Sequence, residues 1–257
     1  MKKIFFTFLA VSIGLLAMAQ TDVYHDGTEA GHNYVDLGLT SGTKWATMNI
    51  GASKAQDYGN YYAWGEVAPK SIYDWNTYKY INTKLTKYNT DSRYGKDGFT
   101  DNKATLDPVD DAAYVKWGGK WRMPTGVQQE ELRKQCYWEW TENYNNSGVK
   151  GYVIYRAKAE DDKGVKRIKG VIRSLSSYSY TLSDAHIFLP AAGSRANDGS
   201  YYVGSYGHYW SLALRTDKPD HSHDMFFKDD DGVDSNGDGL DFHRCLGQSV
   251  RAVIPGE

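Results

Sequence analysis

An acidic stretch at positions 229–241 contains residue types and spacings that bind cations. Counted from Asp234, it places Asp234, Asn236 and Asp238 at alternate positions and a glycine at the sixth, as a calcium-binding loop does. The twelfth position of such a loop is a bidentate glutamate, whereas here it is Cys245. Because carboxylates crowded in one short loop repel one another without a cation, a weak calcium site is one interpretation of the stretch, and no other cofactor is predicted.

The same stretch has a second interpretation as a β-hairpin. The sequence Asn-Gly-Asp-Gly at 236–239 is a strong turn signal, and it stands between the apolar run at 225–227 and the last strand-like run of the chain. A hairpin tip explains the glycines and the short polar residues without a cation. Both interpretations stay open at the level of the sequence.

Histidine and cysteine give weaker signals for chemistry. His221 and His223 are spaced as a zinc-binding pair, but no third ligand follows at a suitable spacing, so they are predicted to be surface-loop histidines. The two cysteines, Cys136 and Cys245, either form a disulfide in an oxidising compartment or are two free buried thiols. The sequence contains no glycine-rich phosphate loop, nucleophile elbow or helical His-Glu-x-x-His motif, and we predict no catalytic residue.

The last third of the chain combines aromatic rings with polar groups in segments predicted to be loops or loop-flanking. Tyrosine rings stack on the apolar faces of sugars and anchor protein interfaces, and acids and arginines supply hydrogen bonds beside them. The predicted ligand-binding residues are Tyr201, Tyr202, Tyr206, His208, Arg215, Asp217, His243 and Arg244. Ordinary packing of tyrosine-rich loops explains each residue equally well, and a carbohydrate and a protein remain alternative ligands.

Many short strands are expected to position these residues. Alternating or apolar runs separated by Gly, Asn, Asp and Ser predict them. The runs lie at 34–37, 44–48, 61–64, 151–157, 167–172, 186–189, 208–214, 224–228 and 249–254.

Two helices are predicted between the early and the late strands. Asp107 as N-cap with proline after it predicts a helix over 108–117, and glycines at 118 and 119 end it. Thr125 and Gln128 form a capping-box pattern that predicts a second helix over 126–137. Two helices among many short, mostly antiparallel strands place the chain in the α+β class.

The N-terminus has the features of an export signal. Two lysines, an apolar stretch at 4–16 and small residues around Ala19 predict a signal peptide at 1–19. The apolar stretch is shorter than the roughly 20 residues of a spanning helix, and no later stretch is apolar enough to cross a membrane. We therefore expect an exported protein in the periplasm, on the cell surface or in the medium. Residues 20–32 are expected to be a flexible leader and 33–257 a single domain.

The charge of the chain excludes one class of partner. The formal net charge is -2, with 30 Lys and Arg against 32 Asp and Glu. A nucleic-acid-binding domain carries a basic patch and a high isoelectric point, so no nucleic-acid partner is predicted.

Five phrases, in order along the chain, resemble the Fibrobacter succinogenes major paralogous domain, a family abundant in secreted Bacteroidetes proteins. They are YVDLGLTSGTKWATMNIGA at 34–52, DYGNYYAWGE at 57–66, WGGKWRMPT at 117–125, FLPAAGSR at 188–195, and YWS at 209–211 with SVRAV at 249–253. The resemblance implies a C-type-lectin-like fold. It also implies kinship with formylglycine-generating enzymes and with the variable binding proteins of diversity-generating retroelements.

The resemblance carries two functional expectations. A formylglycine-generating enzyme needs a reactive cysteine pair near the C-terminus, whereas here Cys245 stands alone. In the variable proteins the ligand face is the C-terminal hairpin with nearby loops, and the matching positions run from Arg215 to Arg244. We therefore expect an exported, non-enzymatic binding or adhesion module. A structural subunit of a surface assembly and a formylglycine-generating-type oxidase are the alternatives.

Most of the quoted phrases have a structural interpretation. Their glycines suit turns that require positive φ, and four tryptophans are large enough to fill an irregular core. These residues are Gly38, Gly42, Gly51, Gly59, Gly65, Gly118, Gly119 and Gly193 with Trp45, Trp64, Trp121 and Trp210. Arg122 and Arg251 are expected to form buried pairs with Asp or Glu.

Overall fold

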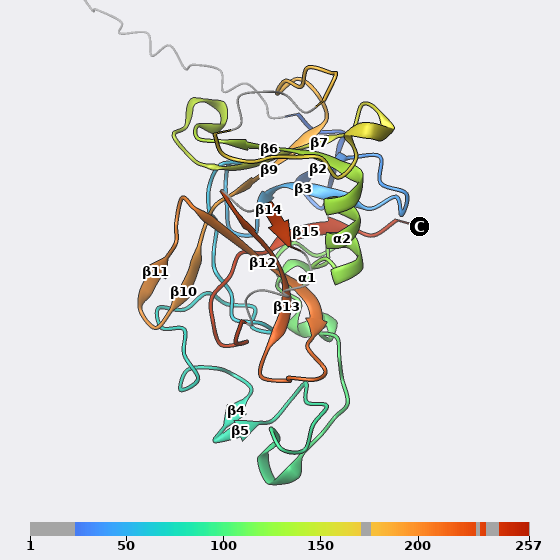
Figure 1. The fold of residues 1–257 in the computed structure, drawn as a ribbon. Helices are drawn as coiled ribbons and strands as arrows, with labels where there is room; N and C mark the ends of the chain where they lie inside the picture. Colours follow the sequence, from blue (N-terminus) through green and yellow to red (C-terminus); the bar gives the residue numbers. More distant parts are fainter. Residues whose placement is uncertain (1–23, 171–175, 230–231, 235–241, 257) are drawn as a thin grey trace, which may run out of the picture.

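The computed structural model describes residues 24–170, 176–229, 232–234 and 242–256. Within these residues the chain forms two α-helices and small sheets of mostly antiparallel strands (Figure 1). The predicted α+β class with two helices is therefore confirmed. The proposed signal peptide, 1–19, lies outside the described residues, and none of the described helices has the length and apolar character to span a bilayer.

The first sheet joins the two ends of the described chain. Its order is β1 (Gly27–Glu29), β2 (His32–Asp36), β3 (Lys44–Asn49) and β15 (Arg251–Ile254), and every pairing is antiparallel. β1 lies in the segment 20–32, which was expected to be a flexible leader. That expectation is wrong for this part of the segment, because Gly27 pairs with Tyr34 and the strand closes a hairpin.

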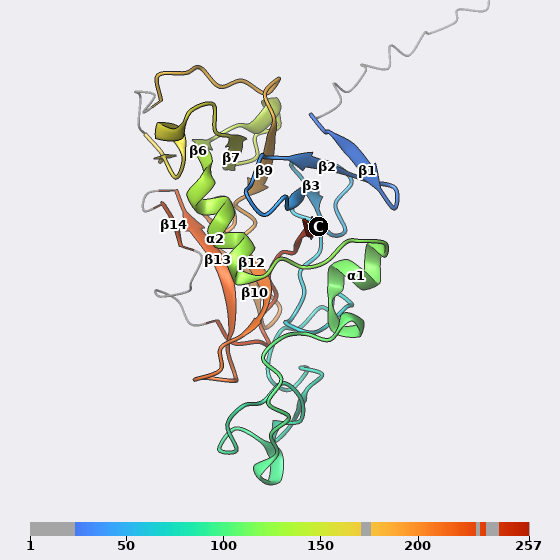
Figure 2. The same ribbon diagram turned by 90° about the vertical axis from the view of Figure 1, so that its right-hand side faces the viewer.

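The second sheet has the order β8-β6-β7-β9. The strands are β6 (Cys136–Thr141), β7 (Gly151–Arg156), β8 (Lys166–Arg167) and β9 (His186–Pro190). β7 pairs antiparallel with both β6 and β9, whereas the short β8 runs parallel to β6. β9 also contacts β3, so the second sheet lies against the first (Figure 2).

The third sheet consists of β12 (Tyr206–Leu214), β13 (Ser222–Lys228) and β14 (Gly232–Asp234), all antiparallel. Lys228 pairs with Gly232, so the chain turns back between these two residues. The tip of the hairpin predicted from the turn signal at 236–239 lies outside the described residues, so this prediction remains untested. β13 finds its partner before that signal, and residues 235–241 lie outside the described structure.

Two small hairpins complete the strands, and four 3-10 turns lie between the larger elements. The hairpins are β4 (Ile81–Asn82) with β5 (Lys84–Leu85) and β10 (Ser194–Ala196) with β11 (Gly199–Tyr201). The turns are η1 (Lys96–Gly98), η2 (Pro108–Asp110), η3 (Tyr144–Asn146) and η4 (Glu160–Asp162).

The first predicted helix is divided into two pieces. η2 forms one 3-10 turn, and α1 (Ala112–Trp117) begins after a new N-cap at Asp111. The Asp111 carboxylate accepts hydrogen bonds from the backbone N–H groups of Ala113 and Tyr114 at 2.8 and 3.1 Å. These two N–H groups belong to the first turn of α1 and have no partner inside the helix. Asp111 therefore begins the helix, not Asp107 as the sequence suggests.

The second helix, α2 (Gly126–Gln135), begins as predicted. The Thr125 side chain accepts the Gln128 N–H, and the Gln128 side chain accepts the Thr125 N–H. The helix ends two residues earlier than predicted, because Cys136 and Tyr137 already belong to β6. α2 packs against β12 and β13.

Two predicted strands differ from the structure. The run at 61–64 forms no strand and contains one isolated bridge, in which Tyr62 and Gln248 exchange backbone hydrogen bonds of 2.9 and 3.0 Å. The run at 167–172 contributes only its first residue to β8. Residues 171–175 lie outside the described part of the chain.

The core is aromatic and divides into two main clusters. One fills the space between the first two sheets, α2 and the inner face of β12 and β13, and includes Trp45 and Trp138. The other contains Trp64, Trp121 and Trp210 and lies under the long segment that follows Trp64. All four tryptophans predicted to fill the core are fully buried, which confirms their structural role.

The eight predicted glycines all have positive φ, as expected. The angles are 68° at Gly38, 71° at Gly42, 82° at Gly51, 71° at Gly59, 78° at Gly65, 68° at Gly118, 55° at Gly119 and 63° at Gly193. An added Cβ at Gly193 would lie 2.1 Å from the Tyr201 carbonyl oxygen, so only glycine fits this position.

Candidate functional site

Three consecutive large side chains are exposed at the end of β11 and in the turn that leads to β12. Tyr201, Tyr202 and Val203 have 45%, 60% and 43% of their surfaces exposed. Other large apolar side chains that the structure leaves exposed in the described residues stand singly. Scattered single residues are normal on a protein surface, whereas contiguous ones indicate a contact surface. We call Tyr201, Tyr202, Val203 and Tyr206 the tyrosine turn.

Backbone hydrogen bonds hold the tyrosine turn against the body of the protein. The Gly193 N–H donates to the Tyr206 carbonyl at 2.7 Å, and the Gly204 N–H donates to the Ala191 carbonyl at 2.8 Å. Inside the turn, the Tyr206 N–H donates to the Tyr202 carbonyl at 2.9 Å. Tyr202 itself is left-handed, with φ at 59°. The exposed rings therefore stand on a fixed backbone.

A column of aromatic rings leads from the turn into the protein. The rings of Tyr202 and Tyr206 are stacked with centroids 4.4 Å apart and planes at 15°. Tyr206 meets Phe226 edge-on at 5.5 Å, and His208 lies between Phe226 at 4.8 Å and Phe242 at 4.3 Å. The alternation of β12 explains the column, since Tyr206 and His208 are two residues apart and face the same side.

His208 is not accessible to a ligand, contrary to the prediction. Its side chain is 1% exposed, and its Nδ1 lies 3.2 Å from Oδ2 of the equally buried Asp224. The pair lies under Tyr206, Phe226 and Phe242. His208 therefore supports the aromatic column from inside.

Arg244 is also a structural residue, contrary to the prediction. Its guanidinium is fully buried and donates to the hydroxyl of Tyr78 at 2.9 Å. It also donates to the backbone carbonyls of Tyr88 and Pro219, at 2.8 and 2.9 Å, and of Lys87, at 3.1 Å. Arg244 thus ties the C-terminal segment to residues 78–88.

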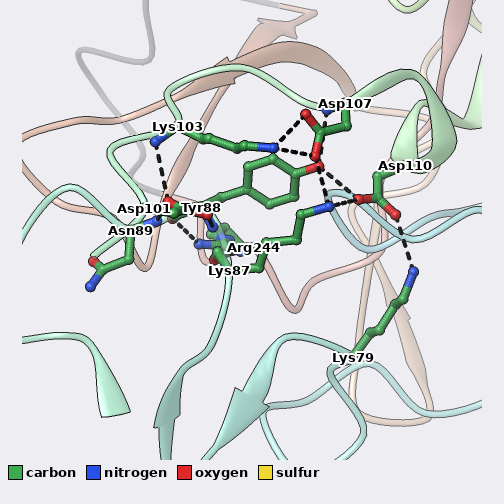
Figure 3. A network of polar contacts seen from close by, with 9 residues as sticks. All are labelled: Lys79, Lys87, Tyr88, Asn89, Asp101, Lys103, Asp107, Asp110 and Arg244. Carbon is green, nitrogen blue, oxygen red and sulfur yellow. Dashed lines mark hydrogen bonds and ion pairs between the residues drawn. The ribbon is translucent and has the colours of Figure 1, made fainter. Parts of the chain in front are cut away.

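The segment between Glu66 and Asp107, which contains β4 and β5, extends to the lower end of the molecule (Figure 2). A polar network fastens its base (Figure 3). The buried carboxylate of Asp110 accepts from Lys87 at 2.6 Å, Tyr88 at 2.7 Å and Lys79 at 3.1 Å. Asp107 completes the network with ion pairs to Lys87 and Lys103 at 2.9 and 2.8 Å. Each charge has an opposite partner, so we assign the network a structural role.

The network makes a prediction about pH. Burial alone would raise the pKa of Asp110, but the bonds from Lys87, Tyr88 and Lys79 hold that pKa well below the usual 3.8. A depressed pKa in the folded state stabilises the protein above about pH 4, and the stabilisation is lost as the pH falls further. We expect Asp110→Asn to cost about 1–3 kcal/mol near pH 6.

Urea unfolding measured near pH 6 and near pH 3 checks this prediction. The difference in unfolding free energy between wild type and Asp110→Asn should shrink at the lower pH. Asp217→Asn is the control, because Asp217 pairs with Arg215 on the surface and its side chain is 71% exposed. An Asp110→Asn effect that is equal at both pH values would contradict the assignment.

Arg215 and Asp217 form an ion pair of 2.9 Å just after β12. The tyrosine turn lies at the opposite end of this strand, which has nine residues. At about 3.3 Å per residue the two ends lie about 25 Å apart. The eight predicted ligand residues therefore do not form one face. Tyr202 and Tyr206 stack on each other, Tyr201 is next to them in the sequence, and Arg215 and Asp217 lie at the other end of β12.

Asp220, His221 and His243 form the group of possible metal ligands among the described residues. The Nδ1 atom of His221 lies 2.8 Å from Asp220 Oδ1, and that of His243 lies 3.8 Å from Asp220 Oδ2. His221 is 1% exposed, so the prediction of a surface-loop histidine is wrong for this residue. Partial burial opposes ionisation of Asp220, but the contact with His221 holds its pKa below the usual range.

The sequence places the third member of this group 22 positions after His221, beyond any local spacing rule. His223, the other histidine of the local pair, is not part of the group. The bridge between the backbones of His221 and His243 brings the two rings together. The calcium prediction remains untested, because Asp234 ends β14 and Asn236 and Asp238 lie outside the described residues.

Both cysteines are free and buried, so the disulfide alternative is wrong. Cys136 belongs to the core cluster around Trp45, and Cys245 to the cluster around Trp64. Burial raises the pKa of both thiols, that of Cys245 to about 12. Neither thiol is therefore ionised at neutral pH, which a nucleophilic or metal-binding cysteine requires.

Two surface clefts do not qualify as sites. A cleft of about 470 Å³ lies between α2 and residues 40–41, and one of about 390 Å³ lies beside Arg156. In the larger cleft the Glu131 carboxylate already accepts from Thr40 and from both donors of Ser41. Its polar groups therefore hold two parts of the protein together and are not available to a ligand.

No model of a known protein family matches this chain, and neither a curated protein nor a solved structure matches it. The family resemblance of the five phrases therefore remains a prediction.

Proposed function

We propose that this chain is an exported carbohydrate-binding module and that the tyrosine turn is its contact surface. The observation that carries the proposal is the contiguous exposure of Tyr201, Tyr202 and Val203, at 45%, 60% and 43%. Exposed aromatic rings cost free energy in water unless a ligand covers them. Here they are held outward by a fixed backbone, so little conformational entropy is lost when a ligand binds.

The size of the surface favours a saccharide over a protein. A stable protein interface buries about 800 Å² per partner and involves about 20–30 residues on each side. The tyrosine turn has four residues, enough to cover one or two sugar rings. A tyrosine ring offers a flat apolar plane for the C–H face of a sugar, and its hydroxyl stays available for hydrogen bonds.

Polar groups stand next to the turn in the sequence and on the surface. Asn197, Asp198 and Ser200 are exposed in the β10–β11 hairpin, which ends at Tyr201. They supply an amide, a carboxylate and a hydroxyl, the groups that bind sugar hydroxyls. Arg195 is fixed in this hairpin, because its guanidinium donates to the Asp198 carbonyl at 3.0 Å.

Membership of the major paralogous domain family, with a C-type-lectin-like fold, forms part of the proposal. It is supported by the order of the five phrases, by the α+β architecture and by the structural role of their glycines and tryptophans. The resemblance places the ligand face between Arg215 and Arg244. We place it earlier, because Arg244 is buried and Arg215 already pairs with Asp217.

The proposal includes the absence of catalysis by cysteine. A formylglycine-generating-type oxidase needs a reactive, accessible cysteine pair. Cys136 is 0% and Cys245 3% exposed, they lie in different core clusters, and both have raised pKa values. These properties support a binding role over the oxidase alternative.

A glycan array probed with the labelled protein tests the proposal. We expect binding to a defined group of saccharides, and we expect Tyr202→Asn to reduce it by at least about tenfold, equivalent to about 1.4 kcal/mol. Asparagine is chosen because it tolerates the positive φ of residue 202. Tyr178→Asn is the matched control, since Tyr178 is 47% exposed outside the turn.

Two outcomes would overturn the proposal. Binding of no saccharide on the array would remove the carbohydrate class. Equal loss of binding in Tyr202→Asn and Tyr178→Asn would remove the tyrosine turn as the contact surface.

A further inference from the structure

We propose that Asp220, His221 and His243 form a zinc-binding site. Two imidazoles and one carboxylate are a ligand set that zinc accepts, and three protein ligands leave a fourth position for water or another small ligand. The site lies where the end of the β12–β13 connection meets the segment that begins at residue 242. It is independent of the proposed carbohydrate surface.

The distances in the group match what a tetrahedral ion requires. Zinc binds nitrogen and oxygen ligands at about 2.0–2.2 Å, so two ligand atoms on one ion lie on the order of 3.3 Å apart. The Nδ1 atoms of His221 and His243 lie 2.8 and 3.8 Å from the two Asp220 oxygens. The three ligand atoms all lie within 4.8 Å of one another. Side-chain rotations that change the distances between the ligand atoms by at most about 1.5 Å would therefore place all three atoms around one ion.

The backbone fixes two of the ligands relative to each other. His221 and His243 face each other in an antiparallel bridge, and their ring centroids are 4.2 Å apart. The Asp220 carbonyl accepts the N–H of Arg244 at 3.0 Å, which closes the same connection from the other side. Because the ligands come from two segments far apart in the sequence, a bound ion would join these segments.

Packing around the group restricts its rings but leaves one side open. His221 is 1% exposed, and Trp75 meets the His243 ring edge-on at 5.5 Å. The side chain of His243 is 46% exposed and that of Asp220 24%. Solvent therefore reaches the carboxylate and one imidazole, which gives an ion a path into the site and leaves room for a water ligand.

The ligand types select zinc over calcium. Calcium takes six to eight oxygen ligands, whereas this group offers two nitrogens and one carboxylate. Separate titrations with zinc and calcium therefore distinguish this site from the calcium loop predicted at Asp234, Asn236 and Asp238. A loop of that kind should respond to calcium, and the Asp220–His221–His243 group should respond only to zinc or to a similar ion.

Calorimetric titration of chelator-treated protein with zinc chloride, followed by calcium chloride, tests the proposal. We expect one zinc per chain, and His243→Ala should weaken its binding at least about tenfold. His223→Ala is the matched control, because His223 is close in sequence but outside the group. Circular dichroism of each variant shows that it is folded. His243 is the preferred position because its side chain, at 46%, is the most exposed of the three ligands.

Cobalt gives a second readout that surface histidines would not produce. A cobalt ion in a tetrahedral site has intense visible absorption, and we expect this absorption in the wild type and in His223→Ala but not in His243→Ala. Absence of zinc heat at millimolar concentration, or equal affinity of wild type and His243→Ala, would overturn the proposal. Saccharide binding that persists without zinc leaves the proposed function intact, so the two proposals fail separately.

Discussion

We expect Arg244→Ala to lower the free energy of unfolding by roughly 3–5 kcal/mol. The guanidinium is fully buried and donates to the Tyr78 hydroxyl and to the carbonyls of Lys87, Tyr88 and Pro219. Alanine removes all of these donors at once, so the three carbonyls lose these bonds and the Tyr78 hydroxyl keeps only its own bond to the Trp64 carbonyl, at 2.8 Å. It also removes a cation that lies 5.0 Å from the centre of the Trp64 ring.

Urea unfolding, followed by tryptophan fluorescence, measures this change. Arg215→Ala is the matched control, because Arg215 belonged to the same predicted ligand set but forms a surface ion pair with Asp217. An exposed pair contributes about 0–1 kcal/mol, so the control should unfold almost like the wild type. Equal stability of the two variants would show that Arg244 does not fasten the segment 78–88 to the C-terminal part of the chain.

A second large loss is expected for Arg251→Ala, also roughly 3–5 kcal/mol. Arg251 was expected to pair with an acid, but its partners are neutral. It donates to the Asn49 amide oxygen at 2.9 Å and to the carbonyls of Ala46 and Phe188 at 2.9 and 2.7 Å. These bonds link β15 to β3 and to β9. Burial lowers the pKa of Arg251 to about 10, which leaves it charged at neutral pH.

The stability of Arg251→Lys separates the contribution of the guanidinium geometry from that of the positive charge, and Arg167→Ala is the control. Lysine keeps the charge but lacks the planar fork, so it should recover only part of the loss. Arg167 pairs with Glu139 while both side chains are about one quarter exposed, at 24% and 28%, and its replacement should cost about 1 kcal/mol or less. Full recovery in Arg251→Lys would contradict the role of the three directed hydrogen bonds.

Local sequence signals predicted the scaffold well, because they depend on neighbouring residues. The capping box at Thr125 and Gln128 and the eight left-handed glycines are of this kind, since φ and the first helical turn are set within a few residues. The start of the helix at 108–117 was predicted wrongly, because local signals do not show which aspartate has partners in distant segments. Three aspartates compete there for one N-cap, and tertiary contacts to Lys87 and Tyr88 take Asp110 out of the competition.

The site was harder to predict, because burial of a polar residue depends on distant segments. His208 and Arg244 look like loop or strand-edge residues in the sequence, but Phe242 covers the first and residues 78–88 surround the second. The rings of Tyr202 and Tyr206, four positions apart, stack on each other, while their predicted role as ligand-binding residues stays a prediction. His221 and His243 meet only through a bridge across 22 positions.

Calorimetric titration of the best saccharide from the array into three proteins tests the proposed carbohydrate surface most directly. The proteins are the wild type, Tyr202→Asn and Tyr178→Asn. We predict equal affinity for the wild type and Tyr178→Asn, and an affinity at least about tenfold lower for Tyr202→Asn with its fold intact. Equal affinity of all three proteins would contradict the assignment of the tyrosine turn as the ligand-binding surface.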